Sequence, residues 1–127
     1  MIVLDASTAV LALLNDGDAR RSLASQTVAV PYLVDSEVAH ALRGLVLRGG
    51  VGAEQAGAAL VGWARLGLRR FPVVGLLGRI WELRENLSAY DATYVALAEA
   101  LACDLMTADA RLARSPGPRC AITVVRG

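Results

Sequence analysis

Short apolar segments of three to five residues alternate along this chain with longer segments that have helical periodicity. The apolar segments span residues 2–4, 28–30, 71–74, 105–107 and 122–125. Short apolar strands separated by helices are typical of a parallel sheet that is covered on both faces. The pattern therefore predicts an α/β fold with helices on both faces of a parallel sheet.

The helical segments connect these strands in sequence order. Apolar residues recur at helical spacing in residues 6–14, 16–24, 33–48, 53–66, 76–84 and 90–102, and residues 108–114 are expected to form a turn or a short helix. Glycines at positions 49, 50 and 52 separate two of these segments, which we expect to form a helical hairpin. Because no linker, repeat or low-complexity tract interrupts the sequence, residues 1–127 are predicted to form a single domain.

The apolar content is high, but the apolar residues do not form a stretch that is typical of a membrane-spanning segment. Hydrophobic residues make up 55% of the 127 residues, yet no uninterrupted apolar stretch approaches the roughly 18 residues that a bilayer crossing requires. Asp5 interrupts the apolar run at the N-terminus, and no basic region precedes that run, which is unlike a signal peptide. We therefore expect a cytoplasmic location, with the excess apolar surface buried against a second copy or another protein.

All 13 basic residues are arginine, and this excludes several kinds of chemistry. A phosphate-binding P-loop lysine, a Schiff-base lysine and the lysine of a phospho-receiver domain are all impossible without lysine. Arginine instead offers a planar pair of donors that suits phosphate oxygens. A net charge of +1 argues against a surface coated in basic patches but is compatible with a local arginine rim around an acidic nucleic-acid site.

Two other features favour structural interpretations. Cys103 and Cys120 lack the spacing of metal ligands and are expected to be thiols of the core. Gly50-Val51-Gly52 resembles part of a dinucleotide-binding fingerprint, but Gln55 occupies the position of the third glycine and no strand precedes the motif. No such cofactor is therefore expected.

Four acidic residues stand where strands end or helices begin. Asp5 directly follows the strand at residues 2–4, and Asp109 lies two residues beyond the strand at residues 105–107. Because ligands of open parallel sheets bind beyond the carboxyl ends of the strands, both carboxylates should lie at that edge. Asp91 and Glu37 belong to the early turns of two helices.

Each of these acids also has a purely structural alternative. Asp91 could be an acid that interacts with a helix dipole, Asp109 could cap the turn after it, and Glu37 could be solvated. Asp5 is harder to explain in this way, because an acid that ends an apolar strand lies near the centre of the sheet.

If the four carboxylates converge, they need a cation. Two carboxylates about 5 Å apart repel by roughly 3 kcal/mol at an effective dielectric of about 20. Ligands that are all carboxylate oxygens favour Mg²⁺ or Mn²⁺ over Zn²⁺. Such a site can activate water and hold a phosphate for in-line displacement, so phosphodiester hydrolysis is the predicted reaction.

The sequence around the four acids also resembles a known family. The segments that carry the resemblance are Val3-Leu4-Asp5-Ala6-Ser7, then Pro31 with Glu37-Val38-Ala39 and Ala41-Leu42, then Tyr90-Asp91-Ala92 with Tyr94-Val95-Ala96-Leu97-Ala98, and then Thr107-Ala108-Asp109 with Leu112. Together they resemble PIN-domain ribonucleases, and the short single-domain layout is most similar to VapC toxins of toxin–antitoxin pairs.

The resemblance implies a metal site, a fold and partners. It implies that Asp5, Glu37, Asp91 and Asp109 bind Mg²⁺ or Mn²⁺, that Thr107 supports the site through its hydroxyl, and that Ser7 is a further supporting residue or a helix cap. It also implies a five-stranded parallel sheet, a homodimer, RNA as substrate and a cognate VapB-like antitoxin that binds in a groove near the acids.

The sequence departs from the family pattern at one position. Many members have asparagine where this chain has His40, its only histidine. This side chain could contact RNA or a metal-bound water, or it could have a structural role. Arg43, Arg111 and Arg114 are candidates for phosphate contacts because they lie near the acids in sequence, or they serve solubility.

Two other functions are compatible with parts of this pattern. A haloacid-dehalogenase-like phosphatase would use Asp5 as nucleophile, but it needs a second aspartate where this chain has Ser7 and a lysine that the chain lacks. A protein-binding module could keep the fold without catalysis.

Overall fold

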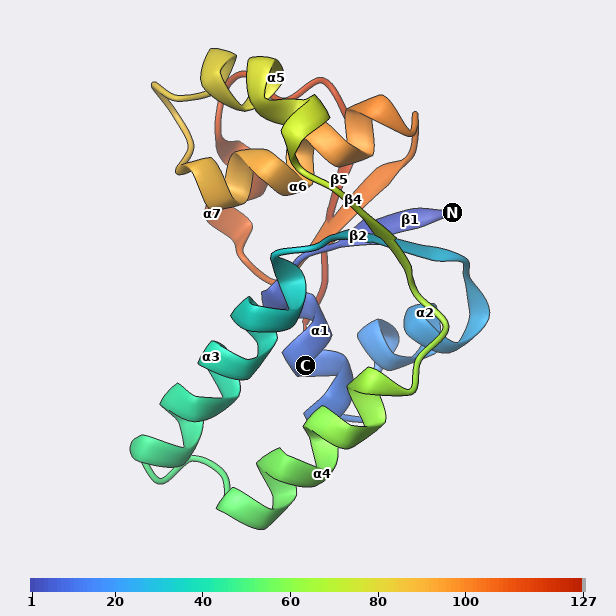
Figure 1. Cartoon of the computed structure of the whole chain (residues 1–127), viewed down its shortest axis with the longest axis vertical. Helices are drawn as coiled ribbons and strands as arrows, with labels where there is room; N and C mark the ends of the chain where they lie inside the picture. The colour runs from blue at the N-terminus through green and yellow to red at the C-terminus, as the bar shows by residue number, and fades with distance from the viewer. Residues whose placement is uncertain (127) are drawn as a thin grey trace.

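Five parallel strands form one sheet in the order β3-β2-β1-β4-β5. The computed structural model describes residues 1–126, and Figure 1 shows that they form a single α/β domain. The strands are β1 (Ile2–Leu4), β2 (Val28–Pro31), β3 (Arg69–Phe71), β4 (Asp104–Thr107) and β5 (Ile122–Val124). The predicted fold class is confirmed. The predicted domain range ends at Gly127, which lies outside the described residues.

The central position of β1 determines where the residue after it lies. Val3 pairs with Ala29 of β2 on one side and with Leu105 of β4 on the other. All three residues are fully buried, so this part of the sheet is apolar on both faces. The carboxyl end of β1 therefore opens at the middle of the sheet edge, as expected for Asp5.

Helices cover both faces of the sheet, as Figure 1 shows. One face carries α1 (Ala6–Leu14), which packs against α2 (Asp18–Ser25), α3 (Val34–Leu47) and α4 (Ala53–Ala64). The other face carries α6 (Ala89–Ala100), which contacts β1, β2 and β4 and is covered by α5 (Leu77–Glu82). The short α7 (Ala110–Arg114) packs against β4 and β5.

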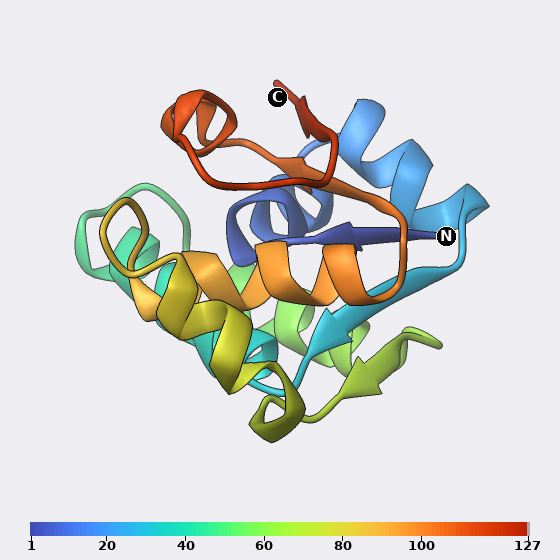
Figure 2. The ribbon, with the colours of Figure 1, turned by 90° about the horizontal axis from the view of Figure 1, so that it is seen from above.

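The helix α6 is the most deeply buried helix of the core. Residues 92–98 are all buried because the sheet lies on one side of the helix and α5 on the other. Figure 2 shows this helix running alongside the strands. Packing of this kind holds the first turn of α6 at the carboxyl edge of the sheet.

Several predicted element boundaries differ from the structure in detail. The strand predicted at residues 71–74 lies at Arg69–Phe71 instead, because Pro72 has no amide hydrogen to donate and a 3-10 helix, η1 (Val74–Leu76), follows. This is an edge strand, which explains why it carries two arginines. The helix predicted at residues 76–84 is shorter, and the segment at residues 108–114 is helical only from Ala110.

The two cysteines and the helical hairpin agree with expectation. Cys103 and Cys120 are free thiols, half-buried against the main core. The helices α3 and α4 pack against each other and extend away from the sheet as a hairpin (Figure 1). Within residues 1–126, none of the helices has both the length and the apolar character that a membrane crossing would need.

Candidate active site

The four acidic residues line one pocket at the carboxyl edge of the sheet. Asp5 follows β1, Asp109 begins α7 after β4, and Asp91 and Glu37 lie in the first turns of α6 and α3. The pocket has a volume of about 190 Å³, and Ala6, Ser7 and Tyr94 complete its lining. We call it the acid pocket. Residues that are more than one hundred positions apart in sequence therefore share one concave site.

Asp5 is the most tightly held of the four carboxylates. Its Oδ1 accepts hydrogen bonds from the Ser7 hydroxyl at 2.6 Å and the Thr8 amide at 3.0 Å, and its Oδ2 accepts from the Thr107 hydroxyl at 2.5 Å. The side chain is 6% exposed and forms the N-terminal cap of α1. These donors fix the direction of the carboxylate before any ligand binds.

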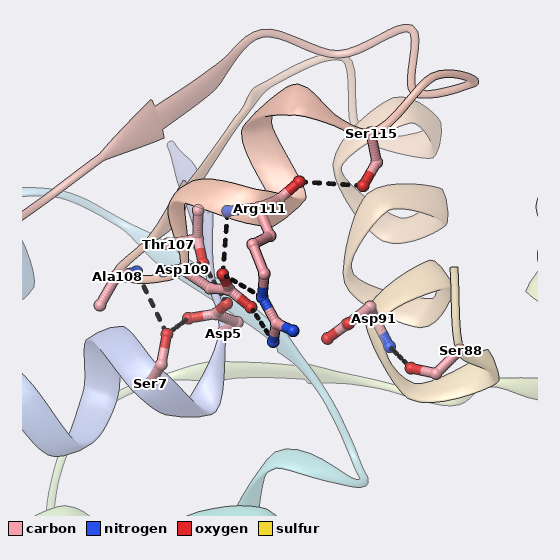
Figure 3. Close-up of polar contacts among 9 residues, drawn as sticks. All are labelled: Asp5, Ser7, Ser88, Asp91, Thr107, Ala108, Asp109, Arg111 and Ser115. Atoms are coloured by element: carbon pink, nitrogen blue, oxygen red, sulfur yellow. Dashed lines mark hydrogen bonds and ion pairs between the residues drawn. The ribbon is translucent and has the colours of Figure 1, made fainter. Parts of the chain in front are cut away.

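The hydroxyls around Asp5 also connect it to the loop that carries Asp109. In Figure 3, Ser7 lies between Asp5 and Ala108, and Thr107 lies beside Asp5 at the end of β4. The Ala108 amide donates to the Ser7 hydroxyl at 3.1 Å, and the Asp109 amide donates to the Thr107 hydroxyl at 3.0 Å. Both hydroxyls therefore act as donors to Asp5 and as acceptors from the β4–α7 loop.

Glu37 is oriented by a tyrosine that the sequence interpretation did not assign to the site. The Tyr94 hydroxyl donates to Glu37 Oε1 at 2.5 Å, and Tyr94 is 2% exposed. Burial raises the pKa of Glu37, and repulsion by Asp91 and Asp5 adds to this, while the Tyr94 hydrogen bond opposes it. Burial and the nearby Glu37 also raise the pKa of Tyr94, so its hydroxyl remains a proton-bearing donor.

Asp91 and Asp109 have opposite electrostatic environments. Burial raises the pKa of Asp91, and the charges of Asp5 and Asp109 raise it further. The guanidinium of Arg111 instead lowers the pKa of Asp109. Its Nε and Nη2 lie 3.3 and 3.2 Å from the two carboxylate oxygens, and the Arg111 amide donates to Oδ1 at 2.9 Å. In Figure 3 the guanidinium lies between Asp109 and Asp91.

The oxygen atoms of the acid pocket suit a hard divalent cation, but they are not arranged as a complete set of metal ligands. The side-chain polar atoms that line the acid pocket are carboxylate and hydroxyl oxygens, the ligands that Mg²⁺ and Mn²⁺ prefer. However, across residues 1–126 no three His, Cys, Asp or Glu side chains are placed so that they could hold one metal ion together. Asp109 is paired with Arg111, and one Glu37 oxygen is taken by Tyr94. A cation would therefore require these side chains to turn toward it.

The other candidate residues lie around the acid pocket. His40 is exposed on α3, one turn after Glu37, and Arg43 and Arg114 are also exposed. Among Arg43, Arg111 and Arg114, Arg111 is the one for which the structure describes a contact with one of the four acids. It pairs with Asp109.

A second network positions the helix that carries Glu37. Asp35 accepts from Trp63 Nε1 at 2.7 Å and from Arg70 Nε and Nη2, both at 2.9 Å. These bonds join α3 to α4 and β3, and the Arg70 hydrogen bond lowers the pKa of Asp35. Neither this network nor the role of Tyr94 was predicted from the sequence. Only the helical spacing of Tyr94, three residues after Asp91, signals that both share a face.

Comparison with known proteins places the chain in a family. The model of the PIN domain matches residues 2–117. The chain therefore belongs to the PIN domain family, as its resemblance implied.

Within this family the most informative relatives are mycobacterial. The chain is 58% identical over 125 residues to VapC ribonuclease Mb0985 of Mycobacterium bovis and to Ribonuclease VapC9 of Mycobacterium tuberculosis, and it covers 98% of each. It is 43% identical over 129 residues to Ribonuclease VapC1 of Mycobacterium tuberculosis, and the match covers 98% of this chain and 97% of the relative.

Solved structures show the same fold at lower identity. PAE2754 from Pyrobaculum aerophilum superposes with a TM-score of 0.72 at 23% identity, covering 97% of this chain and 83% of that one. VapBC2 from Rickettsia felis, solved bound to a promoter DNA fragment, has a TM-score of 0.70 at 17% identity, covering 99% of this chain and 100% of the matched chain.

Proposed function

We propose that this protein is a ribonuclease that hydrolyses phosphodiester bonds of RNA and serves as the toxin of a toxin–antitoxin pair. The observation that carries this proposal is the meeting of Asp5, Glu37, Asp91 and Asp109 in one pocket at the carboxyl edge of the sheet. The 58% identity to proteins named VapC ribonucleases over almost the whole chain supports it.

We propose further that the activity depends on Mg²⁺ or Mn²⁺. The four acids would hold the ion, and Thr107 and Ser7 would hold Asp5 in place through the hydrogen bonds described above. When bound, such an ion lowers the pKa of water and stabilises charge on a phosphate. The raised pKa values of Glu37 and Asp91 support this assignment, because they indicate carboxylates crowded together with too little positive charge nearby.

The chain's own residues prepare the site for this reaction. Tyr94 holds one oxygen of Glu37 at the wall of the acid pocket, and burial there raises the pKa of Glu37. Asp5 is held by hydroxyl and amide donors, so its carboxylate need not reorganise when a ligand arrives.

We propose a VapB-like antitoxin as partner, a homodimer as the assembly and a cytoplasmic location. The relatives named as VapC support the antitoxin, and the Rickettsia felis neighbour is named as a VapBC complex. Large exposed apolar side chains, among them Val74 (76% exposed) and Trp81 (67% exposed), support contacts with other chains.

The test is cleavage of RNA by protein freed of its antitoxin. Wild-type protein with Mg²⁺ or Mn²⁺ should cut RNA, and Asp5→Ala should not. Asp104→Asn is a matched control, because this exposed carboxylate begins β4 at the opposite edge of the sheet and should leave cleavage unchanged. Equal cleavage by the wild type and Asp5→Ala would indicate a contaminating nuclease and would contradict the proposal.

A second candidate is a protein-binding module without catalysis, and the exposed apolar side chains described above favour it. Calorimetric titration of antitoxin-free protein with Mn²⁺ separates the two functions. Absence of Mn²⁺ binding would favour the module.

A further inference from the structure

A larger pocket lies beside the acid pocket and shares a wall with it. It has a volume of about 610 Å³, and three of its lining residues, Ala6, Ser7 and Glu37, also line the acid pocket. The rest of its lining includes Ser36 and His40 of α3 and Tyr90 of α6. We call it the outer pocket. A ligand bound over the acids can therefore extend directly into it.

Tyr90 gives the outer pocket an aromatic surface that the fold itself does not use. The side chain is 64% exposed, although it lies in the first turn of the most buried helix, directly before Asp91. Tyr94, one turn later, is 2% exposed, and its hydroxyl donates a hydrogen bond to Glu37. Tyr90 thus contributes little to the core, and its ring is available to a ligand.

The charge of the shared wall limits what can enter the outer pocket. Glu37 repels phosphate, and the other three acids lie just beyond it. Apart from Glu37, the lining combines apolar groups, Ala6, Ala41 and the Tyr90 ring, with the polar groups of Ser7, Ser36 and His40. Such a lining suits an uncharged, flat, hydrogen-bonding group better than an anion.

RNA supplies a group of this kind at the required place. The ribose joins each base to the backbone, so a phosphate over the acid pocket puts a flanking base into the neighbouring space. Proteins bind unpaired RNA bases by stacking them on aromatic side chains and by hydrogen bonds to the base edges. We propose that the outer pocket binds one unstacked base next to the scissile phosphate, with Tyr90 as the stacking surface and His40 as a hydrogen-bonding partner. This rests on the proposed ribonuclease function.

His40 would then contribute to base preference. A neutral imidazole has one donor and one acceptor nitrogen, so it can distinguish base edges that differ in these groups. Its position on α3, one turn after Glu37, places it on the same face as an acid of the reaction site. Substitution of His40 by alanine should change the ranking of oligonucleotides that differ only in their bases.

The test measures binding of short RNA in place of cleavage. All proteins carry Asp91→Asn to prevent cutting, and binding is followed by fluorescence anisotropy in Mg²⁺. The probes are labelled hexamers of adenylate, cytidylate and uridylate, and a hexamer with the same ribose–phosphate backbone but no bases. Tyr90→Ala should weaken binding of the base-containing hexamers by about 5- to 100-fold and leave binding of the abasic hexamer within about 2-fold.

Matched variants separate stacking from other effects. Tyr90→Phe keeps the ring and should retain affinity for the base-containing hexamers. Tyr32→Ala removes another exposed aromatic ring, 58% exposed, outside the residues that line either pocket, and should have no effect.

Three outcomes would overturn the assignment of the outer pocket. Tyr90→Ala could weaken binding of all four hexamers equally, or it could weaken binding of none of them. It could also weaken binding of a co-purifying protein partner while RNA binding is unchanged. The last result would assign the outer pocket to that partner. A wild-type protein that shows base-dependent binding but never cleaves RNA would instead contradict the proposed function alone.

Discussion

Hydroxyl groups control the direction of the carboxylate at the centre of the acid pocket. Thr107 is fully buried and both donates to Asp5 and accepts from the Asp109 amide. A buried hydrogen bond of this kind contributes modestly to stability, but an unpartnered buried group costs more. At the residue scale, the site therefore depends on small neutral side chains as much as on its four acids.

Removal of the Thr107 hydroxyl should affect stability and activity together. Thr107→Val keeps the shape but leaves Asp5 without one donor, so the free energy of unfolding should fall by about 1–3 kcal/mol, as measured by urea denaturation. RNA cleavage should fall as well. Thr107→Ser keeps a hydroxyl and should retain most of both, and Thr123→Val, at an exposed position of β5, should change neither.

Arg111 should compete with a divalent cation for Asp109. The Arg111 side chain is 85% exposed, and its guanidinium contacts both Asp109 oxygens. Because the pair is open to water, its contribution is small, and Arg111→Ala should tighten Mn²⁺ binding by only a few-fold in calorimetry. Arg114→Ala removes a second positive charge near Asp109 without that contact. An equal effect of both variants would mean that only net charge matters.

At the scale of elements, the first turn of α3 holds two acids whose pKa values are shifted in opposite directions. Asp35 is stabilised as a charge by Arg70 of β3, while burial and neighbouring acids disfavour the charge of Glu37. The Asp35 network holds the helix where Glu37 must enter the acid pocket, beside Tyr94 of α6. The hydrogen bonds of Asp35 therefore stabilise the same turn in which the charge of Glu37 is unfavourable.

This cost predicts a pH-dependent effect of Glu37→Gln. A carboxyl whose pKa is raised by folding lowers stability once it is ionised, so the penalty is complete above the raised pKa and disappears as the pH falls below the ordinary value of about 4. Glu37→Gln should therefore stabilise the protein at pH 7, by up to about 1 kcal/mol because the half-buried site is partly screened by water. The gain should vanish near pH 4.

The control for this experiment is another first-turn glutamate. Glu54→Gln removes an exposed carboxylate from the first turn of α4, so it reports the loss of the favourable helix-dipole interaction alone. Urea denaturation of both variants at pH 4 and pH 7 makes the comparison. If Glu37→Gln were no more stable than Glu54→Gln at pH 7, the electrostatic account of the acid pocket would be wrong.

At the scale of the whole molecule, the parallel sheet separates two edges with different roles. The carboxyl edge carries the acid pocket and the starts of α1, α3, α6 and α7. The amino edge carries Cys103, Cys120 and Asp104, which line another cavity that has none of the four acids among its residues. The central strands and α6 connect these edges through one continuous core.

Cation binding at the carboxyl edge should therefore stabilise the whole domain. A ligand that binds only the folded state at 100 times its dissociation constant adds about 2.7 kcal/mol, so Mn²⁺ should raise the midpoint of thermal unfolding by several degrees. Asp5→Asn should abolish this shift and Asp104→Asn should not. A shift that persists in Asp5→Asn would place the cation elsewhere.

The sequence by itself determined the plan of this protein. Strand-length apolar segments between amphipathic helices indicate a parallel sheet, and acids at the ends of strands must then meet at one edge, because parallel strands share their carboxyl direction. The positions of Asp5 and Asp109 followed from this rule. Local sequence also accounts for the cap of α6, because serine is favoured at the residue before a helix, and the Ser88 hydroxyl accepts from the Asp91 amide at 3.1 Å.

Only the tertiary structure decided which side chains pair and which pocket each one lines. Tyr94 and Glu37 are 57 residues apart, and Asp35 and Arg70 are 35 apart, so nothing in local periodicity predicts their contacts. The pairing of Arg111 with Asp109, and the shared wall between the acid pocket and the outer pocket, depend on how α3, α6 and α7 converge at the sheet edge. Periodicity reports the environment of a residue along its own element, whereas a contact between elements depends on their packing in three dimensions.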